Sequence, residues 1–226
     1  MPYVLAALLA LAGISWETKL DRAQVAARAA NQPILIEFWA TWCEGCKEMD
    51  RDVYSDEGVA SSMKKVVALR IDVDREPGLA RKYAVDGTPT LVVTDSFGRE
   101  MFRYLGAMPR DRMVDLLAAL PADITRINTL SARLAADGRD FAALDGLGGE
   151  LAAAGFHRSS SEYYARALKT PGGKDAAARP RILLALGRNA LALRRPLDAR
   201  PFLREIVARY PASAESAEAA RLLAGG

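Results

Sequence analysis

The segment from Ile34 to Asp50, "ILIEFWATWCEGCKEMD", constrains the fold of this 226-residue chain more than any other stretch. It begins with an apolar run interrupted only by Glu37, which is typical of a strand buried on both faces of a sheet. The run is followed at once by Cys43 and Cys46, the only two cysteines, and then by a sequence of helical composition. The segment therefore predicts a central strand that leads through two cysteines into a helix.

The sequence on either side of this segment predicts an α/β region. Amphipathic and apolar patterns alternate, with short turns between them. Because helices and strands alternate, we expect helices on both faces of one sheet over residues 16–120. The expected elements are a helix over 16–31, strands over 34–40 and 66–74, a short helix opening at Pro77, two antiparallel strands around the turn at 96–98, and a helix over 110–120.

Residues 124–226 carry no strand signal and predict an all-α second domain. Gly and Pro divide them into segments of helix length at 138, 155, 171–173, 196 and 211. An internal repeat runs through the segments, and its spacing and residue types resemble tetratricopeptide repeats. A plain helical bundle remains the alternative. The repeated residues are Leu144, Leu147, Gly148, Leu151, Ser160, Tyr164 and Ala167, which recur 39 residues later as Leu183, Leu186, Gly187, Ala190, Ala199, Leu203 and Ile206.

Residues 1–15, "MPYVLAALLALAGIS", form an apolar stretch shorter than the roughly 20 residues that cross a bilayer. Ala10-Leu11-Ala12 has the small-x-small pattern of a signal-peptidase site. We therefore expect a signal peptide or the remnant of a membrane anchor, and a place in the bacterial cell envelope, periplasmic or secreted. An apolar first helix and a cytoplasmic location are the alternatives, since a single Cys-x-x-Cys is compatible with either compartment. The net charge of +3, without a Lys/Arg block, argues against nucleic acid as a partner.

The two cysteines have the spacing of a redox dithiol. At a strand-to-helix junction the Cys43 sulfur would lie at a helix N-terminus, where free N–H groups and the helix dipole favour the thiolate. Cys46, one turn later, could close a ring and expel a bound partner. A structural zinc site would need about four ligands, and the only histidine, His157, belongs to the helical half, where we expect a solvated loop. Two inert buried cysteines would not require such a junction.

The segment "ILIEFWATWCEGCK" resembles the active-site segment of the thioredoxin superfamily, and the likeness extends from about residue 16 to 120. Within that superfamily the sequence is most similar to envelope domains such as the C-terminal domain of the bacterial thiol:disulfide interchange protein. "DGTPTLVV" supports the resemblance, because it implies a cis-proline at Pro89, after Thr88, lying against the cysteines. The resemblance also implies exchange with protein or peptide disulfides, an upstream redox partner, and no cofactor besides the Cys43-Cys46 pair.

The resemblance assigns roles to several residues. Cys43 is the expected nucleophile and Cys46 the resolving thiol, and Glu37 stands where thioredoxins place a buried Asp that accepts the Cys46 proton, here expected through water. We expect Trp42, Thr88, Glu44 and Gly45 to contact substrate, and Trp39 to be simple core. A Glu37 that reaches the sheet edge is the alternative to a catalytic one.

Two departures from thioredoxin stand out. Glu44-Gly45 replaces Gly-Pro between the cysteines, which puts a negative charge beside the Cys43 thiolate. Ala68 replaces the buried lysine that thioredoxin pairs with its Asp, and Arg70 reaches the same face only if the strand register holds. The sequence thus predicts a thiol:disulfide oxidoreductase whose helical repeats recruit a partner protein. The alternative is a protein-binding scaffold in which the thioredoxin-like fold is mainly a docking module.

Overall fold

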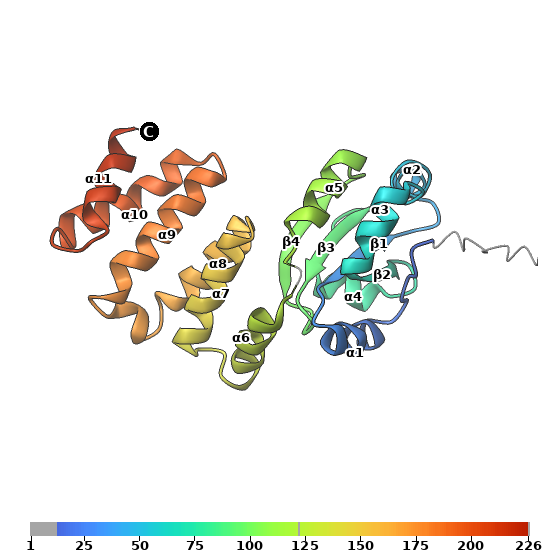
Figure 1. Ribbon diagram of the computed structural model, residues 1–226, viewed down its shortest axis with the longest axis horizontal. Coiled ribbons are helices and arrows are strands. Elements are labelled where there is room, and N and C mark those ends of the chain that lie inside the picture. The colour runs from blue at the N-terminus through green and yellow to red at the C-terminus, as the bar shows by residue number, and fades with distance from the viewer. Residues whose placement is uncertain (1–12, 122, 226) are drawn as a thin grey trace, which may run out of the picture.

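The computed structural model describes residues 13–121, here called the sheet region, and residues 123–225, here called the helical region. Figure 1 shows the two regions side by side, with the C-terminus at the end of the helical array far from the sheet. Most of the predicted leader, residues 1–12, lies outside the described residues. Within the described ranges, no helix combines the length and the apolar character needed to span a bilayer.

The sheet region is a four-stranded mixed sheet with helices on both faces, as the sequence predicted. The strands lie in the order β2-β1-β3-β4, so the strand that leads into the cysteines, β1, is interior. β1 is parallel to β2 and antiparallel to β3, and β3 and β4 form the predicted antiparallel pair. The elements are α1 (Leu20–Ala30), β1 (Ile34–Trp39), α2 (Glu44–Asp52), α3 (Glu57–Ser62), a 3₁₀ turn η1 (Met63–Lys65), β2 (Val67–Asp72), α4 (Pro77–Lys82), β3 (Thr90–Thr94), β4 (Glu100–Leu105) and α5 (Arg110–Ala119).

Side chains of β1 alternate between two apolar layers, as the two-residue period of a strand requires. Ile34, Ile36 and Phe38 are buried with residues of α1. Leu35 is buried against α2, α3 and α5. Glu37 shares the parity of Leu35 and therefore points to the same face as the helix that carries the cysteines.

The expected helix over 16–31 is wrong in its first turn. Residues 16–19 are not helical, and α1 begins only at Leu20. The backbone of Glu17 instead bonds to the free edge of β2: its N–H donates to the Ala68 carbonyl at 2.8 Å, and its carbonyl accepts from the Arg70 N–H at 2.9 Å. An edge strand offers unpaired backbone groups, and satisfying them outweighs the helical pattern of the side chains here. The extended segment brings Trp16 beside β2.

The helical region consists of helices separated at the predicted Gly and Pro positions. Gly155, between α7 and α8, has φ +79°, a left-handed conformation that glycine adopts without a steric cost. His157 is not in a solvated loop as expected: it is the first residue of α8, and its Nδ1 lies 2.9 Å from Asn189 Oδ1. The elements are α6 (Thr125–Ala136), α7 (Phe141–Ala153), α8 (His157–Ala167), η2 (Gly172–Lys174), α9 (Ala178–Ala192), α10 (Pro196–Arg209) and α11 (Ser216–Ala224).

The 39-residue repeat corresponds to two helical hairpins with the same close contact. A Cβ at Gly148 would lie 2.8 Å from ring atoms of Tyr164, and a Cβ at Gly187 would lie 2.7 Å from Leu203 Cδ2. Gly187 and Leu203 are the repeat equivalents of Gly148 and Tyr164, so each hairpin packs a glycine of its first helix against a large side chain of its second. All fourteen residues of the repeat are buried. The tetratricopeptide assignment itself stays a prediction.

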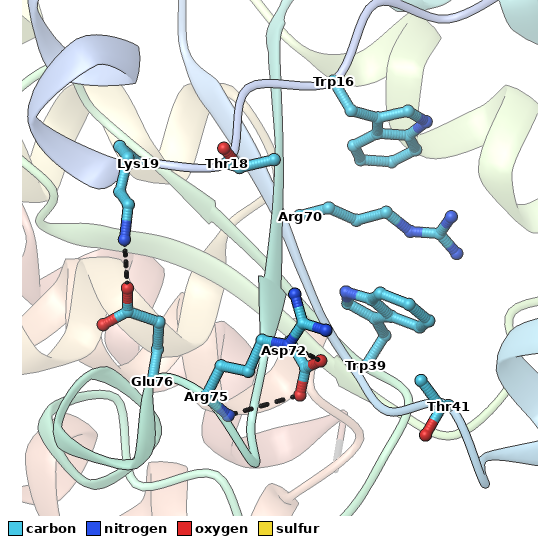
Figure 2. A pocket seen from close by; sticks show the side chains of 9 residues that line it. All are labelled: Trp16, Thr18, Lys19, Trp39, Thr41, Arg70, Asp72, Arg75 and Glu76. Carbon is cyan, nitrogen blue, oxygen red and sulfur yellow. Dashed lines mark hydrogen bonds and ion pairs between the residues drawn. The ribbon is translucent and has the colours of Figure 1, made fainter.

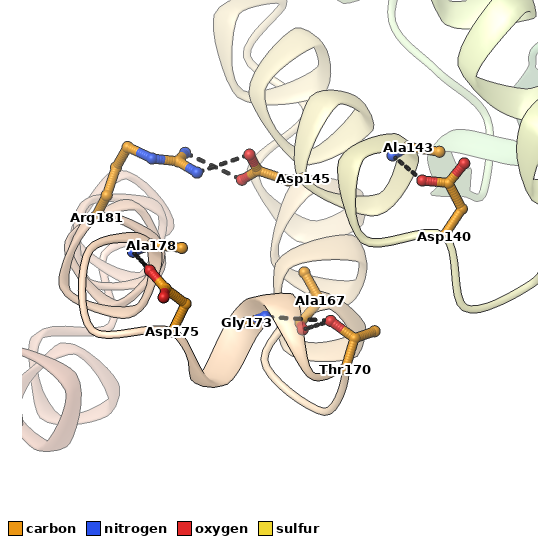
Figure 3. A network of polar contacts seen from close by, with 9 residues as sticks. All are labelled: Asp140, Ala143, Asp145, Ala167, Thr170, Gly173, Asp175, Ala178 and Arg181. Atoms are coloured by element: carbon orange, nitrogen blue, oxygen red, sulfur yellow. Dashed lines mark hydrogen bonds and ion pairs between the residues drawn. The ribbon is translucent and has the colours of Figure 1, made fainter.

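Polar contacts tie the hairpins together and cap their helices (Figure 3). The Arg181 guanidinium forms a bidentate pair with Asp145, at 2.7 and 3.0 Å, which joins α9 to α7. The Asp140 carboxylate accepts from the Ala143 N–H at 3.0 Å and so caps α7. A cap of this kind supplies a partner for a free N–H group at a helix start.

The two regions share buried core. One cluster of buried apolar side chains runs without a break from β3 through α6, α7 and α8 to Leu186 of α9. Phe102 of β4 meets Phe156, with ring centroids 5.9 Å apart. The Ser131 hydroxyl of α6 donates to the Asp95 carboxylate at the end of β3. The helical region is therefore packed onto the β4 side of the sheet.

Candidate active site

Cys43 and Cys46 form a disulfide at the start of α2. Cys43 is the N-cap residue, and its Sγ accepts a hydrogen bond from the Cys46 N–H at 3.1 Å. Both sulfurs therefore lie where the helix dipole and free N–H groups stabilise negative charge.

A three-residue connection joins the interior strand to the disulfide. β1 ends at Trp39, and residues 40–42 lead from there to Cys43. The Cys43 N–H donates to the Ala40 carbonyl at 3.1 Å, which closes the connection into a turn. Because the connection is short and its backbone is hydrogen-bonded, the interior strand fixes where the sulfurs lie.

Pro89 packs against Gly45, the residue that precedes Cys46. The Thr88-Pro89 peptide bond is cis, the form that the family resemblance implies. A Cβ at Gly45 would lie 3.1 Å from Pro89 Cδ and 3.5 Å from Ala107 Cβ, so the residue between the cysteines packs on the proline ring. The Pro89 carbonyl accepts from the Gly106 N–H at 2.8 Å, which fixes the proline to the end of β4. A methyl group at position 45 would therefore require the proline ring to move by a few tenths of an ångström.

Trp42 and Glu44 lie on the outer side of the site. The Trp42 residue is 65% exposed, yet its Nε1–H donates to Asp74 Oδ2 at 2.9 Å, so the indole is held in place. Glu44 forms an exposed ion pair with Lys47 at 3.2 Å. The Lys47 cation offsets part of the negative charge that the sequence placed beside Cys43, although an exposed pair of this kind is weak.

Glu37 is completely buried and paired. Arg70 stands directly opposite it on β2, so the register does bring the two side chains to one face. Arg70 Nε donates to Glu37 Oε2 at 2.8 Å. The same guanidinium also pairs with Asp50 of α2, at 2.8 Å. Glu37 therefore does not reach the sheet edge, and Arg70 supplies the cation that Ala68 cannot.

Two indoles enclose Arg70 (Figure 2). The guanidinium carbon lies 5.2 Å from the Trp16 ring centroid and 4.9 Å from that of Trp39, with the arginine stacked between them. A cavity of about 520 Å³ opens beside this stack. Trp39 was expected to be simple core. It instead stacks on the Arg70 guanidinium and lines the cavity. The residues at the rim of the cavity include two ion pairs, Lys19 with Glu76 and Arg75 with Asp72.

Burial and charge set the proton affinity of the groups around Glu37. Burial raises the pKa of Glu37, and the Arg70 cation opposes part of that increase. Burial, with the Glu37 carboxylate nearby, also holds the pKa of Tyr54 well above its usual value. The raised pKa means that this buried carboxyl binds a proton more readily than an exposed carboxyl does.

Comparison with known proteins places this site in a family. The thioredoxin-like domain family matches residues 20–121. Thioredoxin of Mycoplasma pneumoniae is 31% identical over 90 residues, which are 40% of this chain and 84% of that protein. This chain belongs to the thioredoxin family. The family match ends where the helical region begins.

Two further comparisons each cover less than half of this chain. Thiol:disulfide interchange protein DsbD of Ralstonia nicotianae is 31% identical over 87 residues, which are 37% of this chain and only 14% of that protein. A solved thioredoxin from Thermus thermophilus is 28% identical and covers 47% of this chain and 85% of its own, with a TM-score of 0.43.

Three residues that contribute to this thioredoxin-family site were not assigned a role from the sequence. Asp50 follows Cys46 by four residues, so the helical period alone puts both on one side of α2. Trp16 was assigned to a helix, and only its pairing with the β2 edge brings it to Arg70. Leu105, 62% exposed at the end of β4, lies opposite Thr90 beside Pro89 and had no signal in the sequence.

Proposed function

We propose that this chain is a protein thiol:disulfide oxidoreductase that uses the Cys43-Cys46 pair. The observation that carries the proposal is the disulfide at the N-terminus of α2, packed through Gly45 on cis-Pro89. Its membership of the thioredoxin family supports the same activity. The dithiol is itself the redox centre, so the reaction proposed here uses no further cofactor.

The proposed cycle is a pair of thiol-disulfide exchanges. The Cys43 thiolate attacks one sulfur of a substrate disulfide, which forms a mixed disulfide and releases the other sulfur as a thiolate. Cys46 then loses its proton to Glu37 and attacks the Cys43 sulfur. The enzyme is left oxidised with its disulfide closed, and the substrate leaves as two thiols. Run backwards, the same steps oxidise a substrate dithiol.

We propose that substrate binds over Trp42, Gly45 and the Thr88-Pro89 backbone. The exposed indole of Trp42 and the exposed Leu105 offer apolar surface near the proline. An extended substrate segment can pair with the backbone at Thr88 in the manner of an added strand. The substrate class is therefore an extended protein or peptide segment that carries a disulfide or a dithiol.

The redox equilibrium of the cysteine pair tests the proposal. The full chain is equilibrated in glutathione buffers with metals chelated, and its thiols are alkylated and counted by intact mass. A two-electron titration near about −250 mV or lower would identify a reductant supplied by an upstream donor, and one near about −130 mV an oxidant. A pair that does not titrate and exchanges with no disulfide would overturn the oxidoreductase and favour the scaffold.

We propose further that the helical region recruits a partner through an acidic segment of that partner. Arg139, Arg166 and Lys169 line a cavity of about 340 Å³ beside the start of α7 and the end of α8. Among the described residues, none of the three forms an ion pair with a carboxylate, so the cavity favours an anionic occupant. The Arg166 guanidinium is oriented by its hydrogen bond to the Gly138 carbonyl at 3.0 Å.

Charge reversal tests this recruitment without disturbing the shared core. In a Cys46→Ser background, which retains the mixed disulfide, Arg139→Glu, Arg166→Glu and Lys169→Glu together should change which proteins are trapped on Cys43. Arg200→Glu with Arg204→Glu, exposed cations of α10, is the control. Unchanged trapping in the triple variant would contradict recruitment by this cavity. Deleting the helical region is a poorer test, because its core is continuous with that of the sheet region.

We place the protein in the cell envelope, on the apolar N-terminal sequence and the relationship to thiol:disulfide interchange proteins. Expression of the full chain in a bacterium, followed by fractionation and N-terminal mass analysis, tests this. Recovery of uncleaved chain in the cytoplasmic fraction alone would contradict it.

A further inference from the structure

We propose that Arg103 is a positioning residue for peptide substrates. Its side chain fixes the start of residues 83–89, here called the proline loop, and so places the Thr88-Pro89 backbone. The inference rests on the proposed oxidoreductase function and deepens it, because it names a residue that acts on the binding of an extended substrate and not on the exchange of sulfurs. Arg103 lies on β4, which β3 separates from the strand that leads into the cysteines.

A β-bulge brings Arg103 and Glu100 to the same face of β4. Val92 and Thr94 of β3 are two residues apart and share a face of the sheet. Their partners on β4 are Arg103 and Glu100, which are three residues apart, so Met101 is an extra residue. The shared face lets the Glu100 carboxylate accept from Arg103 Nε at 3.1 Å and from Nη2 at 2.7 Å. A bidentate pair of this kind holds the guanidinium in one orientation.

The same guanidinium bonds to the end of α4. Its Nη1 donates to the Ala84 carbonyl at 3.0 Å, and its Nη2 donates to the Tyr83 carbonyl. Tyr83 is the C-cap residue of α4, and the last carbonyls of a helix have no partner within the helix. An arginine side chain can supply that partner. Arg103 therefore caps α4 at the point where the proline loop begins.

The backbone conformation of Ala84 depends on contacts of this kind. Its φ is +47°, in the left-handed region, which a residue with a Cβ enters at a steric cost. Such a conformation persists only where the surrounding structure enforces it. The Ala84 N–H donates to the Arg81 carbonyl at 3.0 Å, and Arg103 supplies the partner for the Ala84 carbonyl. Together these bonds set the direction in which the chain leaves α4.

The proline loop is also held at two places closer to the cysteines. The Thr90 hydroxyl donates to the Gly87 carbonyl at 2.6 Å, and the Gly106 N–H donates to the Pro89 carbonyl at 2.8 Å. Between these bonds, the Thr88 N–H and carbonyl form no backbone hydrogen bond within the part of the chain that the structure describes. They are therefore available to an extended substrate, and the anchored residues on either side set their direction.

Two disulfides with the same leaving group test the proposal. One is an uncharged peptide whose single cysteine carries a 2-thiopyridyl group, and the other is the 2-thiopyridyl disulfide of 2-mercaptoethanol, which has no peptide backbone. Reduced full-length protein is mixed with each, and the second-order rate constant is measured from the release of pyridine-2-thione. Hydrogen exchange with mass spectrometry measures the order of the proline loop independently.

The two rate constants should respond differently. Arg103→Met should lower the rate constant for the peptide about tenfold and leave that for the mercaptoethanol disulfide within about twofold, because the cysteines are unchanged. Hydrogen exchange of residues 83–88 should become faster, and that of β1 and α2 should not change. Arg103→Lys keeps the charge without the planar fork and should recover only part of the peptide rate. Arg81→Met removes an exposed cation from the last turn of α4 and should change neither rate.

Several results would overturn the inference. Equal losses with both disulfides would mean that Arg103 supports the fold around Cys43 and not the binding of peptide. An Arg103→Met variant that keeps its peptide rate, or whose proline loop exchanges no faster, would also contradict it. An Arg81→Met variant as slow as Arg103→Met would assign the effect to charge and not to the hydrogen bonds.

A milder variant guards against misfolding. Glu100→Gln keeps Arg103 and removes only the charge of its partner, so it should show a smaller loss with the peptide and no loss with the mercaptoethanol disulfide. Circular dichroism of each variant identifies any that do not fold. If the unaltered protein releases no pyridine-2-thione from either disulfide, the oxidoreductase itself fails, and hydrogen exchange still reports whether Arg103 anchors the loop.

Discussion

The interiors of the two regions differ in the polar groups that they bury. The sheet region buries the carboxyl groups of Glu37 and Asp95, each with a pKa raised by burial. Among the described residues of the helical region, the buried polar side chains are all uncharged: Ser131, Ser159, Ser160, Thr170 and Asn189. The sheet region therefore holds groups that can exchange protons, and the helical region holds groups that only need hydrogen bonds.

This difference suggests that the sheet region carries the reactive groups, whereas the buried polar groups of the helical region serve only to pack its helices. Burying a charged group costs free energy, and a charged or hydrogen-bonding partner offsets that cost. In the helical region, by contrast, Asn189 donates to Ser160 Oγ at 2.8 Å, and Ser160 donates to the Gly148 carbonyl at 2.7 Å. That chain satisfies its own groups and fixes three helices relative to one another.

The largest expected effect is on the rate of disulfide exchange, which should depend on the cysteines of the sheet region and not on the interior of the helical region. Cys43→Ser should reduce disulfide exchange at least about a thousandfold, because it removes the attacking thiolate. Cys46→Ser should still attack and should accumulate the mixed disulfide, which intact mass detects. Asn189→Ala, in the helical interior, should leave the exchange rate within about twofold. A slow Asn189→Ala variant that remains folded would show that the separation is wrong.

The next prediction concerns the contact between the regions. Phe156→Ala should lower the free energy of unfolding by about 3 kcal/mol, because it leaves a cavity against Phe102. Since the buried cluster is continuous, circular dichroism and tryptophan fluorescence should report one shared transition in urea. Two separate transitions in the unaltered protein would indicate that the regions fold independently.

Adjacent glycines of α7 provide a smaller effect with a matched control. Gly148→Ala should destabilise the protein by about 1–2 kcal/mol, because the new methyl group would meet the Tyr164 ring at 2.8 Å. Gly149→Ala, whose methyl group would lie 3.6 Å from the Tyr164 hydroxyl, should be neutral or stabilising by up to about 1 kcal/mol. Urea unfolding measures both, and equal effects would argue against close packing at Gly148.

The smallest expected effect is a dependence of the free energy of unfolding on pH. Burial raises the pKa of Asp95 in the folded protein, so its protonated form favours folding, and that contribution is lost as the pH rises through the folded pKa. The stability of the unaltered protein relative to Asp95→Asn should therefore fall, by about 1 kcal/mol, between acid and neutral pH. Urea titrations at several pH values measure the difference. A relative stability that increases with pH would show that the folded pKa is lowered instead.

Local sequence predicted much of the fold and part of the site. The apolar run of β1, the cysteines at the following helix and the Gly and Pro breaks of the helical region are all local signals. The position of Trp16 was not predictable in this way, because a backbone pairing with β2 replaced the helix that its neighbours favour. His157 was misplaced for a related reason: its contact with Asn189 depends on how α8 packs on α9.

By itself the sequence determined most of the elements, the redox pair and the glycine positions where the helices of each hairpin approach. Each follows from residues close together in the chain, whose periodicity and conformational limits act before any tertiary contact forms. Only the tertiary structure decided that Arg70 faces Glu37. It also decided that Asp50 pairs with the same arginine and that Trp16 stacks on the arginine side chain. Those contacts depend on strand register and on an edge pairing, which are settled by residues far apart in sequence.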